Sequence, residues 1–390
     1  MITYKYKLYR TKKTKYLDAM LLEASWVWNH ALALQKRYYR MYGGYINIGM
    51  MTHKWTQWYG NYSSLGAQTV QEILERLDQS YARFFKHIQN RPPKFKKYRD
   101  FSSFVFKQWG YSLNGNTLTI HKIKKSFKFS LSRPYVGVGK IKRVVLKRSP
   151  LGEYYIFLSI DAQGKPIGKT HNGASVGIDF GLKMYMTLSD STRVQSPLFL
   201  KKGISEKRKI DRKLSKTKAG SNHRQFARRA KNRVENRITN KRDNWQWQMA
   251  HELCRKYDII CIEDLQLTGM TKLWGRKMQD LAHGKMLKKL EYLAPRYGVT
   301  ISKVDRYFPS SKLCECGYVY NELSLYEREW ICPVCGQYHD RDYHAANNIL
   351  RQGIVSLGSP DKTRKSAVTT VRGRKARVAN TQESHDIQMM

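Results

Sequence analysis

Four of the six cysteines lie in two close pairs separated by 15 residues: Cys314-x-Cys316 and Cys332-x₂-Cys335. Paired thiols at this spacing are typical of the two turns of a zinc ribbon, in which four thiolates hold one Zn²⁺ tetrahedrally. Each pair is followed by glycine, which lets the backbone turn back beneath a metal. The pattern predicts one structural Zn²⁺ that contributes about 10 kcal/mol or more to local folding.

The first cysteine pair is one residue shorter than the usual C-x₂-C turn. Two interpretations remain open: a strained ribbon that still binds its metal, or a ribbon that keeps its shape without full occupancy. His339 could replace a thiolate, but its position beside an acidic cluster disfavours it as a ligand. Cys254 and Cys261 lie in apolar stretches and are expected to be small buried side chains.

Three carboxylates mark predicted elements: Asp179 in the strand VGIDFG, Glu263 at the end of the strand IICIEDL, and Asp342 near the start of the helix HDRDYHAANNIL. Asp179 is the single break in an apolar strand, where a carboxylate costs free energy unless it is paired or binds a cation. In the second strand, alternation puts Cys261 and Glu263 on one face and Asp264 on the other. Only one of these two adjacent acids can therefore face Asp179, and we expect it to be Glu263.

The third carboxylate opens a predicted helix over residues 339–350. Small and apolar residues share one face of this helix with Asp342: Ala345, Ala346, Ile349 and Leu350. The alanines would let that face lie close on a sheet and so carry Asp342 towards Asp179 and Glu263. Asp340 suits the N-cap position instead. We therefore favour Asp342 over Asp340 as the functional acid.

Three converging carboxylates could hold divalent cations, although separations of 84 and 79 residues mean that only tertiary structure can bring them together. Hard oxygen ligands suit Mg²⁺ or Mn²⁺. Two such ions about 3.5–4 Å apart would activate water and stabilise the leaving oxygen in phosphodiester hydrolysis. We expect Asp179 to bridge both ions, and Glu263 and Asp342 each to complete one coordination shell. A glycosidase-like acid and base pair is the competing use of carboxylates.

The charge balance favours a polyanionic partner. The 390 residues include 72 Lys plus Arg against 30 Asp plus Glu, a formal net charge of +42. This excess argues against a neutral sugar substrate and for nucleic acid. An anionic membrane surface is the second candidate, but the cations are spread along the chain. No apolar run approaches the ~18–20 residues of a membrane span, and the first residues lack a signal-peptide core. We expect a cytoplasmic, nucleoid-associated protein.

Two segments are candidate nucleic-acid contacts. Residues 201–242 contain 17 Lys or Arg against three acids, which is too one-sided for an ordinary solvated face because like charges repel. Residues 92–108 interleave cations with aromatic rings, which suits either a nucleic-acid groove or a basic surface loop. The candidate contact residues are Lys207, Arg208, Arg212, Lys213, Arg224, Arg228, Arg229, Arg233, Lys94, Lys96 and Lys97.

The remaining pattern predicts the elements that position these groups. A strand opens the chain, helices follow over residues 14–42 and 65–88, and short β runs fill residues 101–162. This order fits a β-barrel with a helical insertion. A Gly-rich connection separates it from two strands of a hairpin that begins near residue 174, and a further helix is predicted over residues 280–297.

The ordered motifs resemble the TnpB family of transposon-encoded, RNA-guided nucleases, relatives of type V CRISPR effectors. They are GIDFGLKMYMTLSD, IICIEDLQL, FPSSKLCECG, LSLYEREWICPVCG and HDRDYHAANNIL. The resemblance covers nearly the whole chain. It implies an α/β plus β fold: an RNase H-like (RuvC) nuclease domain with an inserted zinc ribbon, preceded by a wedge β-barrel carrying a helical recognition insertion.

The resemblance also implies a division of the chain. The expected segments are the first wedge strand (1–10), the helical recognition insertion (11–100), the rest of the wedge barrel (101–168), a first nuclease segment (169–308) with a basic helical insertion (201–257), the zinc ribbon that binds target nucleic acid (309–337), a second nuclease segment (338–358) and a disordered tail (359–390).

By the same resemblance, Asp179, Glu263 and Asp342 take the catalytic positions and the four paired cysteines take the zinc positions. The implied partners are a guide RNA from the transposon end and double-stranded DNA, cleaved beside a short adjacent motif. His344 stands where the family's D-x-N-A-A motif has Asn. Two other functions stay open: a nuclease-dead, RNA-guided DNA-binding repressor, and a guide-independent transposase or accessory DNA-binding protein. Nothing in the sequence indicates the oligomeric state.

Overall fold

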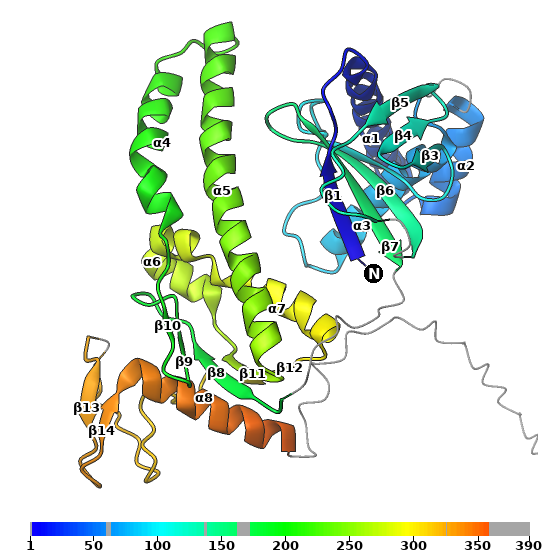
Figure 1. The fold of residues 1–390 in the computed structure, drawn as a ribbon. Helices are drawn as coiled ribbons and strands as arrows, with labels where there is room; N and C mark the ends of the chain where they lie inside the picture. Colours follow the sequence, from blue (N-terminus) through cyan, green and yellow to red (C-terminus); the bar gives the residue numbers. More distant parts are fainter. Residues whose placement is uncertain (1, 60–63, 136–138, 162–171, 325, 359–390) are drawn as a thin grey trace, which may run out of the picture. The chain divides into compact units, whose positions relative to one another are not determined.

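The computed structural model describes residues 2–59, 64–135, 139–161, 172–324 and 326–358 (Figure 1). The chain divides into two compact units, each described by itself below. Unit 1 is Met1–Lys165 with Gly203–Thr239, and unit 2 is Pro166–Lys202 with Asn240–Met390. The expected domain boundary at 168/169 and the expected disordered tail at 359–390 lie outside the described residues.

The first helices of unit 1 are α1 (Thr14–Tyr42), α2 (Ile48–Tyr59) and α3 (Ala67–Phe85). The predicted helix over 14–42 is confirmed, and its apolar positions at three- and four-residue steps are buried. Gly43 ends it in the left-handed region (φ 64°), where its N–H bonds to the Tyr39 carbonyl. Sequence periodicity did not predict α2, whose aromatic residues are irregularly spaced.

Unit 1 also contains two antiparallel sheets, whose first strand precedes these helices in the chain. One has the order β1-β7-β6-β2 and the other β3-β4-β5, and a bridge between Leu8 and Phe129 links them. The strands are β1 (Ile2–Lys7), β2 (Ser103–Phe106), β3 (Tyr111–Asn114), β4 (Thr117–Ile120), β5 (Lys125–Lys128), β6 (Lys140–Arg148) and β7 (Tyr154–Asp161). The predicted order of strand, helices and strands is confirmed, and closure of the strands into a barrel stays a prediction.

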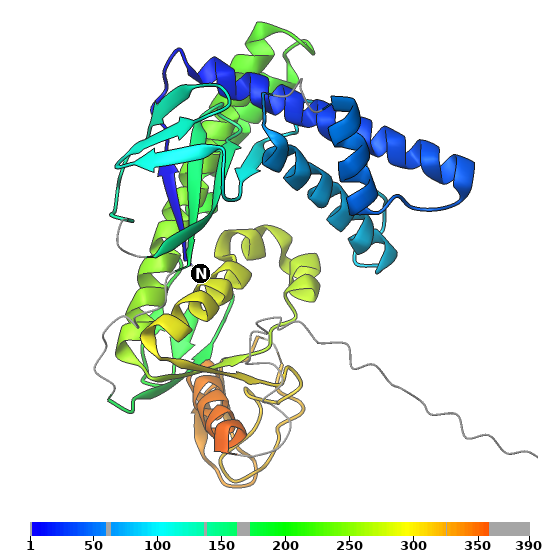
Figure 2. The ribbon, with the colours of Figure 1, turned by 90° about the vertical axis from the view of Figure 1, so that its right-hand side faces the viewer.

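The sheet of unit 2 has five strands in the order β10-β9-β8-β11-β12. Figure 1 labels these strands, and Figure 2 shows the orange helix of residues 341–358 beside them. Strands β8, β11 and the edge strand β12 are parallel, and the predicted hairpin of β8 with β9 is confirmed. The strands are β8 (Ser175–Asp179), β9 (Met186–Leu188), β10 (Arg193–Val194), β11 (Ile259–Glu263) and β12 (Thr300–Val304).

The remaining helices and a small hairpin fall in the second half of the chain. They are α4 (Phe199–Ser215), α5 (Asn222–Lys256), α6 (Leu267–Leu281), α7 (His283–Tyr297), α8 (Arg341–Gly358), β13 (Glu329–Ile331) and β14 (Tyr338–Asp340). The helix predicted over 280–297 begins later, at His283, because Ala282 adopts a left-handed conformation (φ 51°) that separates α6 from α7. Among the described residues, no helix is long and apolar enough to span a membrane.

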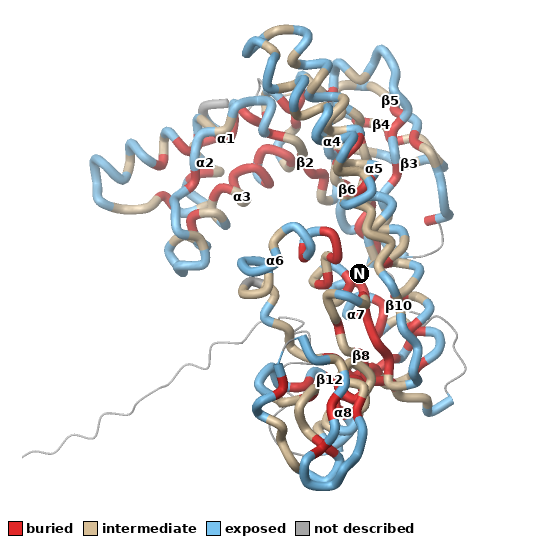
Figure 3. The backbone as a smooth tube through the Cα atoms, turned by 90° about the vertical axis from the view of Figure 1, so that its left-hand side faces the viewer, coloured by how far each residue is buried: buried red, intermediate tan, exposed pale blue. Residues whose placement is uncertain are grey.

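The two faces of the unit 2 sheet pack against different helices. Ile178 and Ile262 pack into a core with residues of α5 and α7. Cys261, in contrast, packs with Val304 and with Ile349 of α8. Alternating residues of β8 and β11 therefore face α8, and the central strands are buried between the helices (Figure 3).

Glycine allows α8 to lie unusually close to this sheet. A Cβ atom on Gly177 of β8 would come within 2.7 Å of the Leu350 backbone nitrogen and would also meet the Ala346 carbonyl. A Cβ on Gly353 of α8 would come within 2.6 Å of Cys261 Cβ on β11. Side chains at these positions would force helix and sheet apart, so the contact depends on bare backbone at both glycines.

Candidate carboxylate centre and zinc ribbon

Asp179 and Glu263 end neighbouring parallel strands on the same face of the sheet. Their preceding residues, Ile178 and Ile262, are a register pair. Two residues before each acid, Gly177 and Cys261 meet α8. Because side chains two apart on a strand share a face, both carboxylates lie on the α8 side. The prediction that Glu263 rather than Asp264 faces Asp179 is consistent with this placement, since Asp264 pairs instead with Arg306.

Asp342 reaches the same region from α8. Ala346, one turn after Asp342, lies over Gly177, and Asp179 is two residues after Gly177. Four helical residues and two strand residues both span about 6 Å. This places Asp342 at the level of Asp179, and the two carboxylates interact electrostatically. The predicted small-residue face is confirmed, with Ala345 and Ala346 buried against the sheet.

Asp340 has the capping role that the sequence predicts. Its Oδ1 accepts a hydrogen bond from the Tyr343 backbone N–H at 3.0 Å, at the start of α8. Its other carboxylate oxygen pairs with the Arg193 guanidinium at 2.6 Å. Both oxygens of Asp340 are therefore engaged, which leaves Asp342 as the acid of this segment that faces Asp179.

The electrostatics of the centre reflect crowded negative charge. Burial, together with the charges of Asp342 and Glu263, raises the pKa of the Asp179 carboxyl to about 7 against the opposing effects of Arg341 and Arg328. Burial likewise raises the pKa of Glu263, with a contribution from Asp264. Arg328 and Arg341 therefore offset the crowded negative charge only in part.

The sequence did not predict two contacts around this centre, those of Arg328 and His283. Arg328, just before β13, pairs with Asp342 at 2.9 Å. His283, which opens α7, is fully buried, and its Nε2 lies 3.2 Å from the carbonyl oxygen of Gly181, two residues after Asp179. Neither contact leaves a local sequence signal, because each joins residues far apart in the chain.

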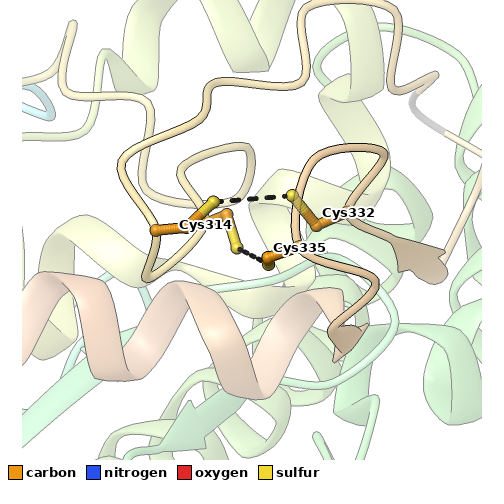
Figure 4. A group of neighbouring side chains, drawn as sticks. Cys314, Cys332 and Cys335 are labelled. Atoms are coloured by element: carbon orange, nitrogen blue, oxygen red, sulfur yellow. Dashed lines mark hydrogen bonds between the residues drawn. The ribbon is translucent and has the colours of Figure 1, made fainter.

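The four paired cysteines converge on one point (Figure 4). Their Sγ atoms lie within 4.8 Å of one another. The distance from Cys314 to Cys335 is 3.5 Å and that from Cys316 to Cys332 is 3.7 Å. Four sulfurs at ~2.3 Å from a tetrahedral Zn²⁺ stand about 3.8 Å apart. The shortened first turn therefore still brings both of its thiols to a zinc-sized site.

The backbone of the ribbon explains how the short turn works. Gly317 and Gly336 adopt positive φ angles of 88° and 72°, as expected for glycines that turn the chain back after each pair. Among the described residues, these four cysteines are the only group of His, Cys, Asp or Glu side chains gathered closely enough to hold a metal ion. The three carboxylates are less tightly gathered, and Asp342 turns to Arg328.

Most of the predicted contact residues in the basic helices α4 and α5 are exposed: Arg208, Arg212, Lys213, Arg228, Arg229 and Arg233. Two are engaged within the helix pair. Lys207 pairs with Glu235 at 2.9 Å. Arg224 donates to the carbonyls of Thr217 at 2.7 Å and Leu214 at 3.2 Å, so it closes the turn after α4.

The second basic segment is anchored to α1. Lys96 places its ammonium 3.6 Å from the Trp28 ring centroid, and burial lowers the pKa of that ammonium. Asn29 bonds to both the N–H and the carbonyl of Lys96 at 2.8 Å. Lys94 and Lys97 are exposed. Lys96 therefore serves a structural contact, whereas its two neighbours are open to a ligand.

Comparisons with known proteins place the chain in a family. Residues 160–273 match a family described as "Probable transposase", and residues 283–349 match the "Cas12f1-like, TNB domain" family. The chain is 30% identical over 315 residues to a Streptomyces pristinaespiralis protein named "Putative RNA-guided DNA endonuclease", covering 80% of this chain and 78% of that protein. The chain belongs to the TnpB family.

Two further comparisons agree with membership of the TnpB family. An Escherichia coli (strain K12) protein named "Putative RNA-guided DNA endonuclease InsQ" is 27% identical over 358 residues, covering 85% of this chain and 87% of that protein. The structure titled "Cryo-EM structure of the Cas12f1-sgRNA-target DNA complex" aligns with a TM-score of 0.59 and 16% identity, covering 87% and 83% of the two chains. This last likeness concerns the mixed α/β fold.

Proposed function

We propose that this TnpB-family protein is an RNA-guided DNA endonuclease that hydrolyses phosphodiester bonds at a centre formed by Asp179, Glu263 and Asp342. One observation carries the proposal. Asp179 and Glu263 lie at the ends of two neighbouring strands on the face that α8 covers, and Asp342 approaches the same place from α8. The names of the two relatives and the net charge of +42 support the same activity.

The carboxylate centre suits Mg²⁺ or Mn²⁺. All three side chains offer hard oxygen ligands. Burial and the neighbouring Asp342 and Glu263 charges raise the pKa of Asp179, and bound divalent cations would offset both effects. Two bound ions would activate the attacking water and stabilise the leaving oxygen. In this proposal Asp179, Glu263 and Asp342 would hold the ions, with Asp179 between the other two acids and so placed to serve both.

The chain's own cations complete the centre. Arg328 pairs with Asp342, and the charge of Arg341 lies close enough to Asp179 to lower the pKa of its carboxyl. The His283 side chain bonds to the backbone carbonyl of Gly181 and so supports the turn that follows Asp179. The two arginines limit the repulsion among the acids, whereas His283 acts only on the turn.

Each unit takes a distinct role in the proposal. The strands of unit 1 form the wedge barrel, and α1, α2 and α3 form the recognition insertion. The sheet of unit 2 with α8 forms the RuvC-like nuclease domain, and residues 309–337 form a zinc ribbon that binds target nucleic acid. The exposed cations of α4 and α5 follow a phosphate backbone, with guide RNA from the transposon end and double-stranded DNA as ligands.

The decisive experiment uses the full chain with its co-purified RNA. That RNA is sequenced, and a DNA duplex carrying its complement beside a randomised adjacent motif is incubated with Mg²⁺. We expect cleavage by the wild type, loss of cleavage after RNase treatment, and binding without cleavage by Asp179→Asn.

Other outcomes would replace the proposal. Guided binding by the wild type without cleavage would make the protein an RNA-guided repressor. Cleavage or strand transfer that survives RNase treatment would make it a guide-independent transposase or accessory factor. The Asp340→Asn variant is the matched control, because Asp340 caps α8 and lies outside the proposed centre.

A further inference from the structure

Two histidines connect the zinc ribbon to α8. His339, the middle residue of β14, places its Nε2 at 3.2 Å from Cys314 Sγ. Its ring packs on His344 of α8 with centroids 3.9 Å apart, and on Trp330 at 4.3 Å. His339 and His344 are only 3% and 5% exposed. We call these two residues the histidine stack.

The contact between His339 and Cys314 has one consistent chemical assignment when the ribbon holds zinc. A zinc-bound thiolate carries no proton, so the shared hydrogen must come from Nε2. Outer-shell hydrogen bonds of this kind orient metal ligands and commonly change metal affinity by ~10–100-fold. The four thiols already supply a complete tetrahedral ligand set. Because His339 Nε2 lies at hydrogen-bond distance from one of their sulfurs, His339 acts beside the metal site rather than as a ligand in it.

His344 carries the connection into α8. Its Nε2 donates to the Leu313 carbonyl at 2.5 Å, directly before Cys314. Asn348, one turn later, donates to the same carbonyl at 2.7 Å and to that of Ser310 at 2.8 Å. The first turn of the ribbon is thus held to α8 by two side chains as well as by the ring stack.

The ribbon and the start of α8 are separated by only a few residues of the chain. His339 and His344 flank Asp340, which caps α8, and Asp342. We propose that His339 donates Nε2–H to the Cys314 thiolate of the zinc-loaded ribbon, and that the histidine stack couples zinc binding to the order of the first two turns of α8. The first turn of α8 carries Asp342, so the same coupling would position that carboxylate; its importance for catalysis rests on the proposed function.

The donor role is tested by zinc release from the full chain loaded with Zn²⁺. Release into excess 4-(2-pyridylazo)resorcinol is followed by absorbance at neutral pH. His339→Phe keeps a flat ring for packing but loses the N–H, and we expect release ~10–100-fold faster. His339→Gln places an N–H the same number of bonds from Cα and is expected to retain zinc within a few-fold of wild type. His121→Phe, an exposed position in unit 1, is the control.

Two results would overturn the donor role. One is release from His339→Phe at the wild-type rate, which would leave only ring packing. The other is release from His339→Gln as fast as from His339→Phe while circular dichroism shows both folded. Should His339→Phe fail to load zinc at all, the Gln variant alone decides.

The coupling is tested by hydrogen exchange of the amides of residues 343–350 in zinc-loaded and zinc-stripped protein. We expect zinc removal to accelerate their exchange several-fold in the wild type, and His344→Ala to exchange as fast with zinc as the wild type does without it. Equal amide exchange rates in zinc-loaded and zinc-stripped wild type would refute the coupling. Neither measurement involves DNA cleavage, so this inference and the proposed nuclease activity fail separately.

Discussion

Asp179 and Glu263 are the last residues of two neighbouring parallel strands and directly follow the paired residues Ile178 and Ile262. Their side chains therefore lie next to each other on the α8 face of the sheet. Parallel pairing in register is what brings together two acids separated by 84 positions. A one-residue slip would send one of them to the opposite face. The helix-facing glycine and cysteine two residues earlier secure this register.

The acids of α8 should separate by role. We expect Asp342→Asn to reduce guided DNA cleavage by more than the ~10–100-fold typical of outer-shell substitutions, because Asp342 faces Asp179. Asp340→Asn should retain cleavage and lose about 1 kcal/mol of stability at most, since it weakens a cap and one ion pair. Initial rates with excess enzyme and melting temperatures give both quantities. Equal loss of cleavage in the two variants would contradict the assignment.

The close helix–sheet contact predicts a strong effect of one methyl group. Gly177→Ala places Cβ against the backbone of Ala346 and Leu350, so we expect a loss of roughly 1–3 kcal/mol and a lower melting temperature. Gly275→Ala in α6 meets no heavy atom within 4 Å, and should be neutral or stabilising by up to ~1 kcal/mol. Equal melting temperatures for the two variants would disprove the packing argument.

The basic helices predict a salt-dependent change in RNA affinity. Arg228 and Arg229 are exposed on α5. The double change to Gln should reduce the slope of log K against log salt by roughly 1.5, because each lost phosphate contact removes ~0.7–0.9. Lys207→Gln should change the slope less, since Lys207 already pairs with Glu235. Filter binding across a salt series measures both, and an unchanged slope in the double variant would exclude these arginines.

His283 predicts a pH effect on stability. Burial lowers the pKa of its imidazole to about 4, below the ordinary value of about 6.5. The unfolded chain therefore binds this proton more readily, and the group's contribution to stability is lost as pH falls from about 6.5 towards 4. The loss by pH 5 is about 2 kcal/mol.

Replacement of this imidazole should remove that pH effect. We expect His283→Phe to show a smaller drop in melting temperature between pH 7.5 and pH 5 than the wild type, whereas His121→Phe, which is exposed, should behave as the wild type does. Identical drops in all three proteins would show that His283 is not the buried neutral imidazole described above.

Local patterns predicted much of this protein. The helix over 14–42 was predicted with the bounds of α1 because its apolar spacing is regular and glycine stops it. The cysteine spacing predicted the converging thiols, including the short first turn. Irregular aromatic spacing hid α2, and the left-handed Ala282 broke a helix whose periodicity continues across it.

By itself, the sequence determined which groups are present: four thiols for a zinc ribbon, two acids in apolar strands and a third at a helix start, and cations for a phosphate backbone. Only the tertiary structure decided which of these groups meet. It turned Asp342 towards Asp179 and Arg328, assigned Arg224 and Lys96 to internal contacts, and stacked His339 on His344. Such meetings depend on strand register and helix–sheet distance, which long-range packing sets and local residue order does not.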